Sequence, residues 1–116
     1  MSYYDLTREI TEYRNPEVFY AFSQKQFDEN RKRIPEGEKI YQGFVSGQYG
    51  TYKGLTEMLN HIEAVEEKIR ANCTPQEIYN YEYDNHECGY TGDDSEALEI
   101  VNHYFPDAKI KRKRHL

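Results

Sequence analysis

The sequence predicts an α+β fold: a helix-rich single domain with a small antiparallel sheet and a basic C-terminal tail. Three observations lead to this prediction. Apolar residues recur at steps of three and four over residues 55–71, which is the spacing of an amphipathic helix. Residues 38–54 contain four glycines between aromatic residues, which disfavours a helix and favours strands with turns. The 116 residues suffice for one hydrophobic core, so we expect a single globular domain over residues 1–107 and a tail over residues 108–116.

The N-terminal segment predicts a helix followed by a strand. Residues 1–14 place their apolar side chains on one face, and we expect Asp5 to cap this helix and Pro16 to end it. Residues 18–22 are rich in β-branched and aromatic side chains, so we interpret them as a buried strand. A helical turn is the alternative for this run.

A capping box and a glycine-containing hairpin come next. Ser23 and Gln26 have the spacing of the box, so we expect a helix over about residues 23–33. The glycines of residues 38–54 then indicate a β-hairpin that carries aromatic packing residues. Their spacing matches neither of the common phosphate-binding loops, which excludes that function for this segment.

Further capping signals organise the C-terminal half. Thr74-Pro75-Gln76-Glu77 is a capping box with proline at the first helical position, and it places residues 79–85 on a helix. The alternation of three tyrosines in that stretch would fit a strand, but the cap and the proline favour the helix. We expect Gly89 to end this helix, and Asp93 with Glu96 to begin the last one. The basic tail should be mobile unless a partner or the acidic part of the chain holds it.

Charge is distributed unevenly along the sequence. The net charge is −6, but residues 57–107 hold thirteen acidic side chains against two basic ones, a net charge of −11. The tail contributes +5 through Lys109, Lys111, Arg112, Lys113 and Arg114. Such an acidic body repels nucleic acid and attracts basic protein surfaces, whereas the tail can contact phosphate or fold back on the acidic body.

Residues 79–94 concentrate tyrosines, carboxylates and potential metal ligands. On a helix, Tyr79, Tyr83 and His86 fall on one side, so one face could present tyrosines among carboxylates. Aromatic side chains contribute contact area and carboxylates steer a basic partner toward the surface. The alternative is an aromatic core beneath a solvated acidic face. The candidate partner-binding residues are Tyr79, Glu82, Tyr83, Asp84, His86, Glu87, Tyr90, Asp93 and Asp94.

His86 and Cys88 suggest two further hypotheses. With Cys73 or a distant histidine they could bind zinc, but one local pair does not have the spacing of a zinc site. Cys88 could also act as a nucleophile with a histidine base, so a small metal-assisted or cysteine-dependent hydrolase is the second functional hypothesis. The alternative is that both residues are structural: His86 lies at a helix end, and Cys88 is a buried thiol. We therefore predict no metal and no cofactor.

The cysteine content and the N-terminal sequence predict a cellular setting. There are two cysteines, and no apolar segment resembles a signal peptide or a membrane span. We expect a reduced, cytoplasmic environment and no membrane partner.

A resemblance to a known group follows from the order of several short motifs. The run Phe19-Tyr20-Ala21-Phe22-Ser23 is followed by Gln26-Phe27, a glycine-rich region from Gly43 to Gly54, and then Asn85-His86-Glu87 before an acidic helix start. This order resembles a group of small uncharacterised proteins carried by phages and mobile elements of gut bacteria, over about residues 17–105. The resemblance implies a genomic setting, and no catalytic residues are carried over from it.

These features together predict a non-enzymatic accessory protein of a phage or mobile element. We expect it to bind a basic protein surface through its acidic, tyrosine-rich face, and inhibition of a host defence component is the activity that this would serve. A third hypothesis is weak, nonspecific nucleic-acid binding through the basic tail, which is short and lacks interleaved aromatic residues.

Overall fold

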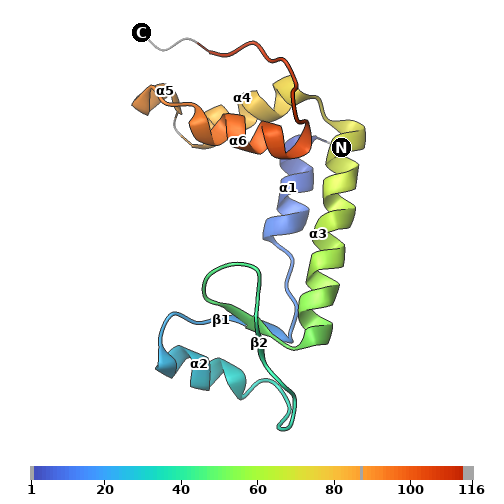
Figure 1. Cartoon of the computed structure of the whole chain (residues 1–116), viewed down its shortest axis with the longest axis vertical. Helices are drawn as coiled ribbons and strands as arrows, with labels where there is room; N and C mark the ends of the chain where they lie inside the picture. The colour runs from blue at the N-terminus through green and yellow to red at the C-terminus, as the bar shows by residue number, and fades with distance from the viewer. Residues whose placement is uncertain (1, 87, 114–116) are drawn as a thin grey trace. The chain divides into compact units, whose positions relative to one another are not determined.

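The computed structural model describes residues 2–86 and 88–113 (Figure 1). It confirms the helix-rich α+β class with a small antiparallel sheet. In chain order the elements are α1 (Tyr3–Thr11), β1 (Val18–Tyr20), α2 (Gln24–Arg31), β2 (Tyr41–Gln42), β3 (Gln48–Gly50), α3 (Tyr52–Asn72), α4 (Pro75–Asn85), α5 (Cys88–Thr91) and α6 (Ser95–Tyr104).

The chain forms two compact units, which we describe separately. The sheet unit consists of Glu12–Glu63, and the helical unit consists of Met1–Thr11 together with Ala64–Leu116. The long helix α3 begins in the sheet unit and ends in the helical unit.

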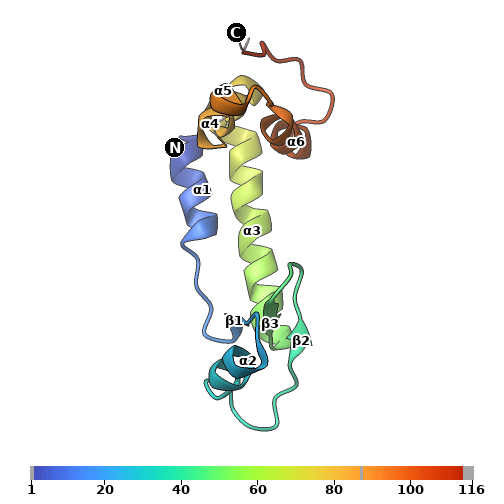
Figure 2. The ribbon, with the colours of Figure 1, turned by 90° about the vertical axis from the view of Figure 1, so that its left-hand side faces the viewer.

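The sheet unit is built on three antiparallel strands, with β3 between β1 and β2 (Figure 2). Phe19 on β1 pairs with Tyr49 on β3, and Gln42 on β2 pairs with Tyr49 from the other side. Helix α2 packs against β1, where Phe27 meets Phe19 and Tyr49 edge to face. The hairpin expected within residues 38–54 is confirmed. The strand expected over residues 18–22 is present over Val18–Tyr20, but it is not a buried strand, because only Phe19 of its three residues is buried and Tyr20 is exposed.

The helical unit has its own core, in which α4 packs against α6 and also contacts α1 and α5. In Figure 1, α4 and α6 lie side by side, and the basic tail, in red, follows α6. Apolar side chains from all of these helices and from the end of α3 meet there, which removes a large apolar area from water. The buried members are Tyr3, Leu6, Val65, Ile69, Cys73, Ile78, Tyr79, Tyr83, Cys88, Ala97, Val101 and Tyr104.

Side-chain caps decide where two helices begin. The Ser23 hydroxyl accepts a hydrogen bond from the Gln26 amide at 3.2 Å, and the Gln26 side chain accepts one from the main chain just before the helix. The Thr74 hydroxyl accepts from the Glu77 amide at 3.1 Å, with proline at the next position. Both predicted N-caps are therefore confirmed. The return bonds differ from those of a capping box, because Gln26 accepts the amide of Phe22 and Glu77 accepts the amide of Tyr3.

The starts of α1 and α3 differ from the prediction. Asp5 does not cap α1: the Ser2 hydroxyl accepts the Asp5 amide at 3.2 Å, and the Asp5 carboxylate lies in the first helical turn. Helix α3 begins three residues before the expected Leu55, because the Thr51 hydroxyl accepts the Gly54 amide at 3.0 Å and so caps an earlier start.

The connection between α4 and α6 also differs from the prediction. Helix α4 ends at Asn85, and Gly89 lies inside the short helix α5 instead of ending α4. The left-handed glycine is Gly92, with φ of 79°, and its amide donates to the carbonyl oxygen of Cys88 at 2.8 Å. Glycine adopts this conformation without strain, so Gly92 is the glycine that ends a helix here, and the helix that it ends is α5.

Within the described part of the chain, no helix combines the length and the apolar character that crossing a bilayer requires.

Thr74→Ala should lower the free energy of unfolding by about 1 kcal/mol, because it removes the cap of α4. Thr56→Ala is the matched control, since Thr56 is exposed within α3 and alanine is the better helix former. Urea unfolding of both variants gives the comparison. An equal or larger loss for Thr56→Ala would contradict the role assigned to the cap.

Candidate functional site

The basic tail is held against α4 by main-chain hydrogen bonds. The side-chain amide of Gln76 contacts both main-chain polar groups of Lys111: its oxygen accepts from the amide at 2.6 Å, and its nitrogen donates to the carbonyl at 3.0 Å. Two residues on, the amide of Lys113 donates to the hydroxyl of Tyr79 at 2.9 Å. These contacts recognise the path of the main chain and do not depend on the side chains of the tail.

Two carboxylates recognise the charges of the tail. Asp94 binds Arg112 through two parallel hydrogen bonds, Nη2 to Oδ1 at 2.7 Å and Nε to Oδ2 at 3.0 Å. Lys113 Nζ lies 3.6 Å from Asp84 Oδ1 and 4.8 Å from the centre of the Tyr83 ring. We call Gln76, Tyr79, Tyr83, Asp84 and Asp94 the tail site.

Tyr79 links the core to this site. Its ring is fully buried, and its hydroxyl donates to Asp94 Oδ2 at 2.8 Å while it accepts the Lys113 amide. Burial raises the pKa of Tyr79, so the hydroxyl keeps the proton that it donates. The hydrogen bonds from Arg112 are the main reason why the pKa of Asp94 lies below its usual value, and the hydroxyl of Tyr79 adds to this effect.

Asp94 stands at the N-cap position of α6 but does not use its side chain as a cap. The cap role falls to Asp93, whose carboxylate accepts the Ser95 amide at 2.9 Å. This bond agrees with the expected role of Asp93 at the start of the last helix. Asp94 is thus free to bind the tail, next to the favourable dipole of a helix N-terminus.

The first part of the tail makes apolar contacts. Ala108 and Ile110 pack against the core of the helical unit. Together with Leu98 and Phe105 they line a cavity of about 310 Å³. Just before them, Asp107 has a positive φ of 65°, so the chain turns there through a conformation that non-glycine residues rarely adopt.

The structure separates the predicted binding residues into different groups. Tyr79, Tyr83 and Glu82 are buried, so the expectation that these tyrosines face solvent is wrong. The reason is that α4 contacts α1, α5 and α6, while the tail contacts Tyr79 and Tyr83. Asp84 and Asp93 are exposed. Glu87 and the side chain of Tyr90 lie outside the described residues.

Glu82 and His86 belong to a second cluster. Glu82 accepts the hydroxyl of Tyr3 at 2.6 Å, and its other oxygen lies 3.0 Å from His86 Nε2. The second ring nitrogen of His86 lies 2.7 Å from a carboxylate oxygen of Glu96. Burial, with a smaller effect from Glu82, raises the pKa of Tyr3, so Tyr3 remains a donor to this buried carboxylate. The cluster supplies polar partners for Glu82 inside the core.

The cysteine and metal hypotheses find little support in this geometry. Cys73 and Cys88 are both free and buried, and burial raises the pKa of each thiol. A catalytic thiol needs the opposite shift and solvent access. Among residues 2–86 and 88–113, no group of three or more histidine, cysteine or acidic side chains is placed to hold a metal ion.

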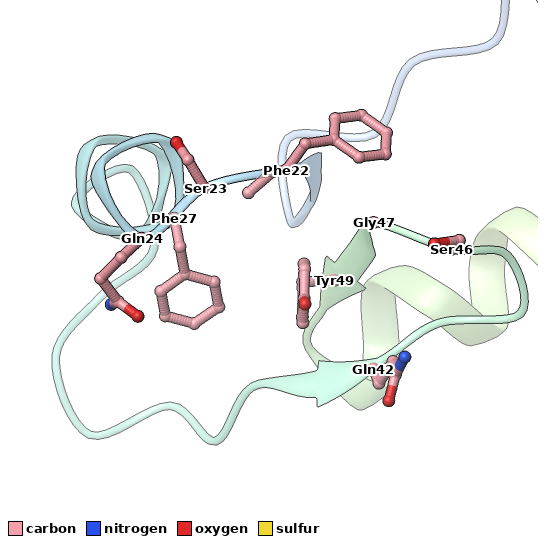
Figure 3. Close-up of a pocket in the computed structure, with 9 residues that line it drawn as sticks. Phe22, Ser23, Gln24, Phe27, Gln42, Ser46, Gly47 and Tyr49 are labelled. Carbon is pink, nitrogen blue, oxygen red and sulfur yellow. The ribbon is translucent and has the colours of Figure 1, made fainter.

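A pocket and several exposed apolar residues of the sheet unit were missed by the sequence analysis. In Figure 3, Phe27 and Tyr49 lie at one end of a pocket of about 520 Å³, and Phe22 lies near Gly47 at the other. A Cβ atom at position 47 would overlap the Phe22 ring, so glycine permits this approach. The exposed large apolar residues of this unit are Tyr20, Phe22, Tyr41, Phe44, Val45 and Tyr52.

The tip of the hairpin corrects the expectation that its aromatic residues pack. Phe44 is 67% exposed in the loop between β2 and β3, and its neighbour Val45 is 55% exposed. Their position between Gly43 and Gly47 is the signal that could have identified them, because apolar residues at a glycine-flanked hairpin tip have no opposing sheet to cover them.

Tyr3→Phe should lower the free energy of unfolding by about 1.5–3 kcal/mol, because it removes a hydrogen bond to a buried carboxylate and preserves the ring. Tyr4→Phe also removes a tyrosine hydroxyl, but at an exposed neighbouring position, so it should change the free energy of unfolding little. Denaturant unfolding of both variants tests the difference. Equal small effects would show that Glu82 does not need the Tyr3 hydroxyl.

The link between Arg112 and Asp94 should also be visible in the pH dependence. Since folding lowers the pKa of Asp94 below its ordinary value of 3.8, the pair contributes fully to stability above that pH. The contribution is lost as the pH falls through the lowered pKa. Arg112→Gln should raise the pKa of Asp94 in an NMR titration, whereas Lys109→Gln, which removes the same charge at an exposed position, should not. Equal shifts in both variants would contradict a specific pair.

Comparison with known proteins gives a family but no characterised relative. The model of a family of unknown function, DUF7659, matches residues 6–114. Neither the curated proteins nor the solved structures contain a match. Since the family model covers nearly all of the chain, this protein belongs to DUF7659, a family of unknown function.

Proposed function

We propose that this protein acts without catalysis, by binding a basic segment of another protein at the tail site. The observation that carries the proposal is that the chain's own Lys111, Arg112 and Lys113 occupy this site through main-chain hydrogen bonds and ion pairs. These are the contacts with which proteins bind extended peptides. A site that accommodates one basic segment has the shape and charge to accept another.

The energetics of the tail contacts support exchange with a partner. The side chains of Arg112 and Lys113 are 61% and 40% exposed, so water and salt weaken their ion pairs. The contact of Lys113 with Asp84 is long and both groups are exposed. Such pairs contribute about 0–1 kcal/mol each, which a partner with the same groups can replace.

The charge of the chain supports the choice of a basic partner. The region from residue 57 to residue 107 carries a net charge of −11, and its exposed carboxylates include Asp84, Asp93, Glu96 and Glu99 near the tail site or along α6. A field of this sign accelerates the approach of basic surfaces and repels nucleic acid. A basic segment is therefore the partner that this charge favours.

The genomic setting is part of the same proposal. We propose an accessory protein of a phage or mobile element of gut bacteria, for which the support is the order of motifs in residues 17–105. In that setting a host defence protein is a suitable partner, because the basic residues with which it binds nucleic acid are complementary to these carboxylates.

Capture from a host lysate tests the proposal. The wild-type chain should retain a partner at low salt and release it at high salt. Asp84→Lys should weaken this retention about tenfold, because it replaces an attraction at the site by a repulsion. Glu29→Lys is the matched control, since it makes the same charge change at an exposed position of the sheet unit. The proposal fails if no salt-sensitive partner is retained, or if both variants behave alike.

A further inference from the structure

We infer that the tail site recognises an extended segment with an apolar residue followed two positions later by arginine, and that the basic tail is an internal competitor for this segment. The inference rests on the proposed function and adds the chemistry of the partner. An acidic cluster alone would not carry it. The independent observation is the seated tail: Arg112 and Lys113 contact the tail site, and Ile110 packs against the core of the helical unit just before it.

The main-chain contacts require an extended occupant. Gln76 binds the amide and the carbonyl of one residue, Lys111, as a neighbouring strand would. Residues 108–113 contain no helix or strand of their own. A residue inside a helix has both of these groups engaged with its own neighbouring turns, so a helical segment would not fit this clamp.

The apolar position is defined by Ile110. Its side chain packs against the core of the helical unit and borders the cavity of about 310 Å³ that Leu98 and Phe105 also line. The cavity leaves room for a side chain larger than isoleucine. A partner with phenylalanine at this position would fill more of it and remove more apolar surface from water.

The arginine position is selective because Asp94 is fixed. The hydroxyl of Tyr79 orients the carboxylate, and Arg112 binds both of its oxygens at once. Lysine carries a single ammonium group and does not reproduce two parallel bonds. At the next position, Lys113 makes one long contact with Asp84, which places little demand on the side chain.

The tether makes the tail an effective competitor even though its contacts are weak. A short linker raises the local concentration of an attached segment to the order of millimolar, so a free segment of equal affinity must exceed this concentration to displace the tail, and a tighter one needs less. The positive φ of Asp107, directly before the tail, is a conformation that residues with a side chain rarely adopt. The structure therefore assigns the tail a seated state that a better-fitting segment can displace.

The test uses the full-length chain and a labelled, end-blocked peptide with the sequence of residues 108–113. Its affinity is measured by fluorescence anisotropy for wild type, for Arg112→Gln and for Lys109→Gln. Arg112→Gln should bind the peptide about tenfold more tightly than the other two, because its own tail competes less. Adding Asp94→Asn to Arg112→Gln should abolish this gain, since it removes the carboxylate that binds arginine.

Peptide variants test the motif. A peptide with lysine in place of the arginine keeps the charge and should bind about tenfold more weakly, and one with phenylalanine in place of the isoleucine should bind more tightly. Equal binding of all basic peptides, including one of scrambled order, would overturn the motif. Equal affinity of wild type and Arg112→Gln would overturn the competition.

The outcome also separates this inference from the proposed function. If no peptide binds any variant while the wild-type chain still retains a salt-sensitive partner from lysate, the inference is overturned and the proposed function stands. If the peptides bind with the expected order but no lysate protein is retained, the recognition chemistry holds and the proposed partner class is wrong.

Discussion

The helical unit depends on one constraint: the buried face of α4 carries polar groups, and each of these groups requires a partner. Glu82 obtains its partners from Tyr3 and His86, and the hydroxyl of Tyr79 obtains its partners from Asp94 and from the main chain of Lys113. The two ends of the described chain thus meet on the same helix. An unpaired carboxylate or hydroxyl in this core would cost more than the hydrogen bonds themselves contribute, and contacts from both ends of the described chain help to avoid that cost.

The two sets of partners have different physical characters. The bond between Tyr3 and Glu82 is buried, short and shielded from salt, so it holds α1 on α4. The contacts of the basic tail lie at the surface, where Arg112 and Lys113 remain largely exposed. The same helix therefore carries a permanent contact on one side and an exchangeable contact on another. This difference is why we propose a binding role for the tail site and assign a structural role to the cluster around Glu82.

The local signals in the sequence were informative where side chain and backbone interact within a few residues. Ser23 and Thr74 begin their helices as expected, and the glycines of residues 38–54 mark a hairpin. Prediction failed where two nearby residues were equally suitable for the same role, as a helix cap or as a helix stop. Asp5 and Ser2 are both residue types that cap helices, and the hydrogen bond from the Asp5 amide to Ser2 identifies Ser2 as the cap. Gly89 and Gly92 can both end a helix, and the positive φ of Gly92 identifies it as the stop.

The sequence by itself determined the α+β class, the N-caps of α2 and α4, and a chain whose acidic region and basic end attract each other. It also brought Tyr79, Tyr83, Asp84 and Asp94 together as candidates. Only the tertiary structure decided that these residues surround the chain's own tail, that Glu82 and His86 belong to another cluster, and that Phe44 and Val45 are exposed. Periodicity tells which side of a helix is apolar, but not which neighbour covers it. Burial depends on contacts between segments that are distant in the chain, such as the contact between residue 79 and residue 113.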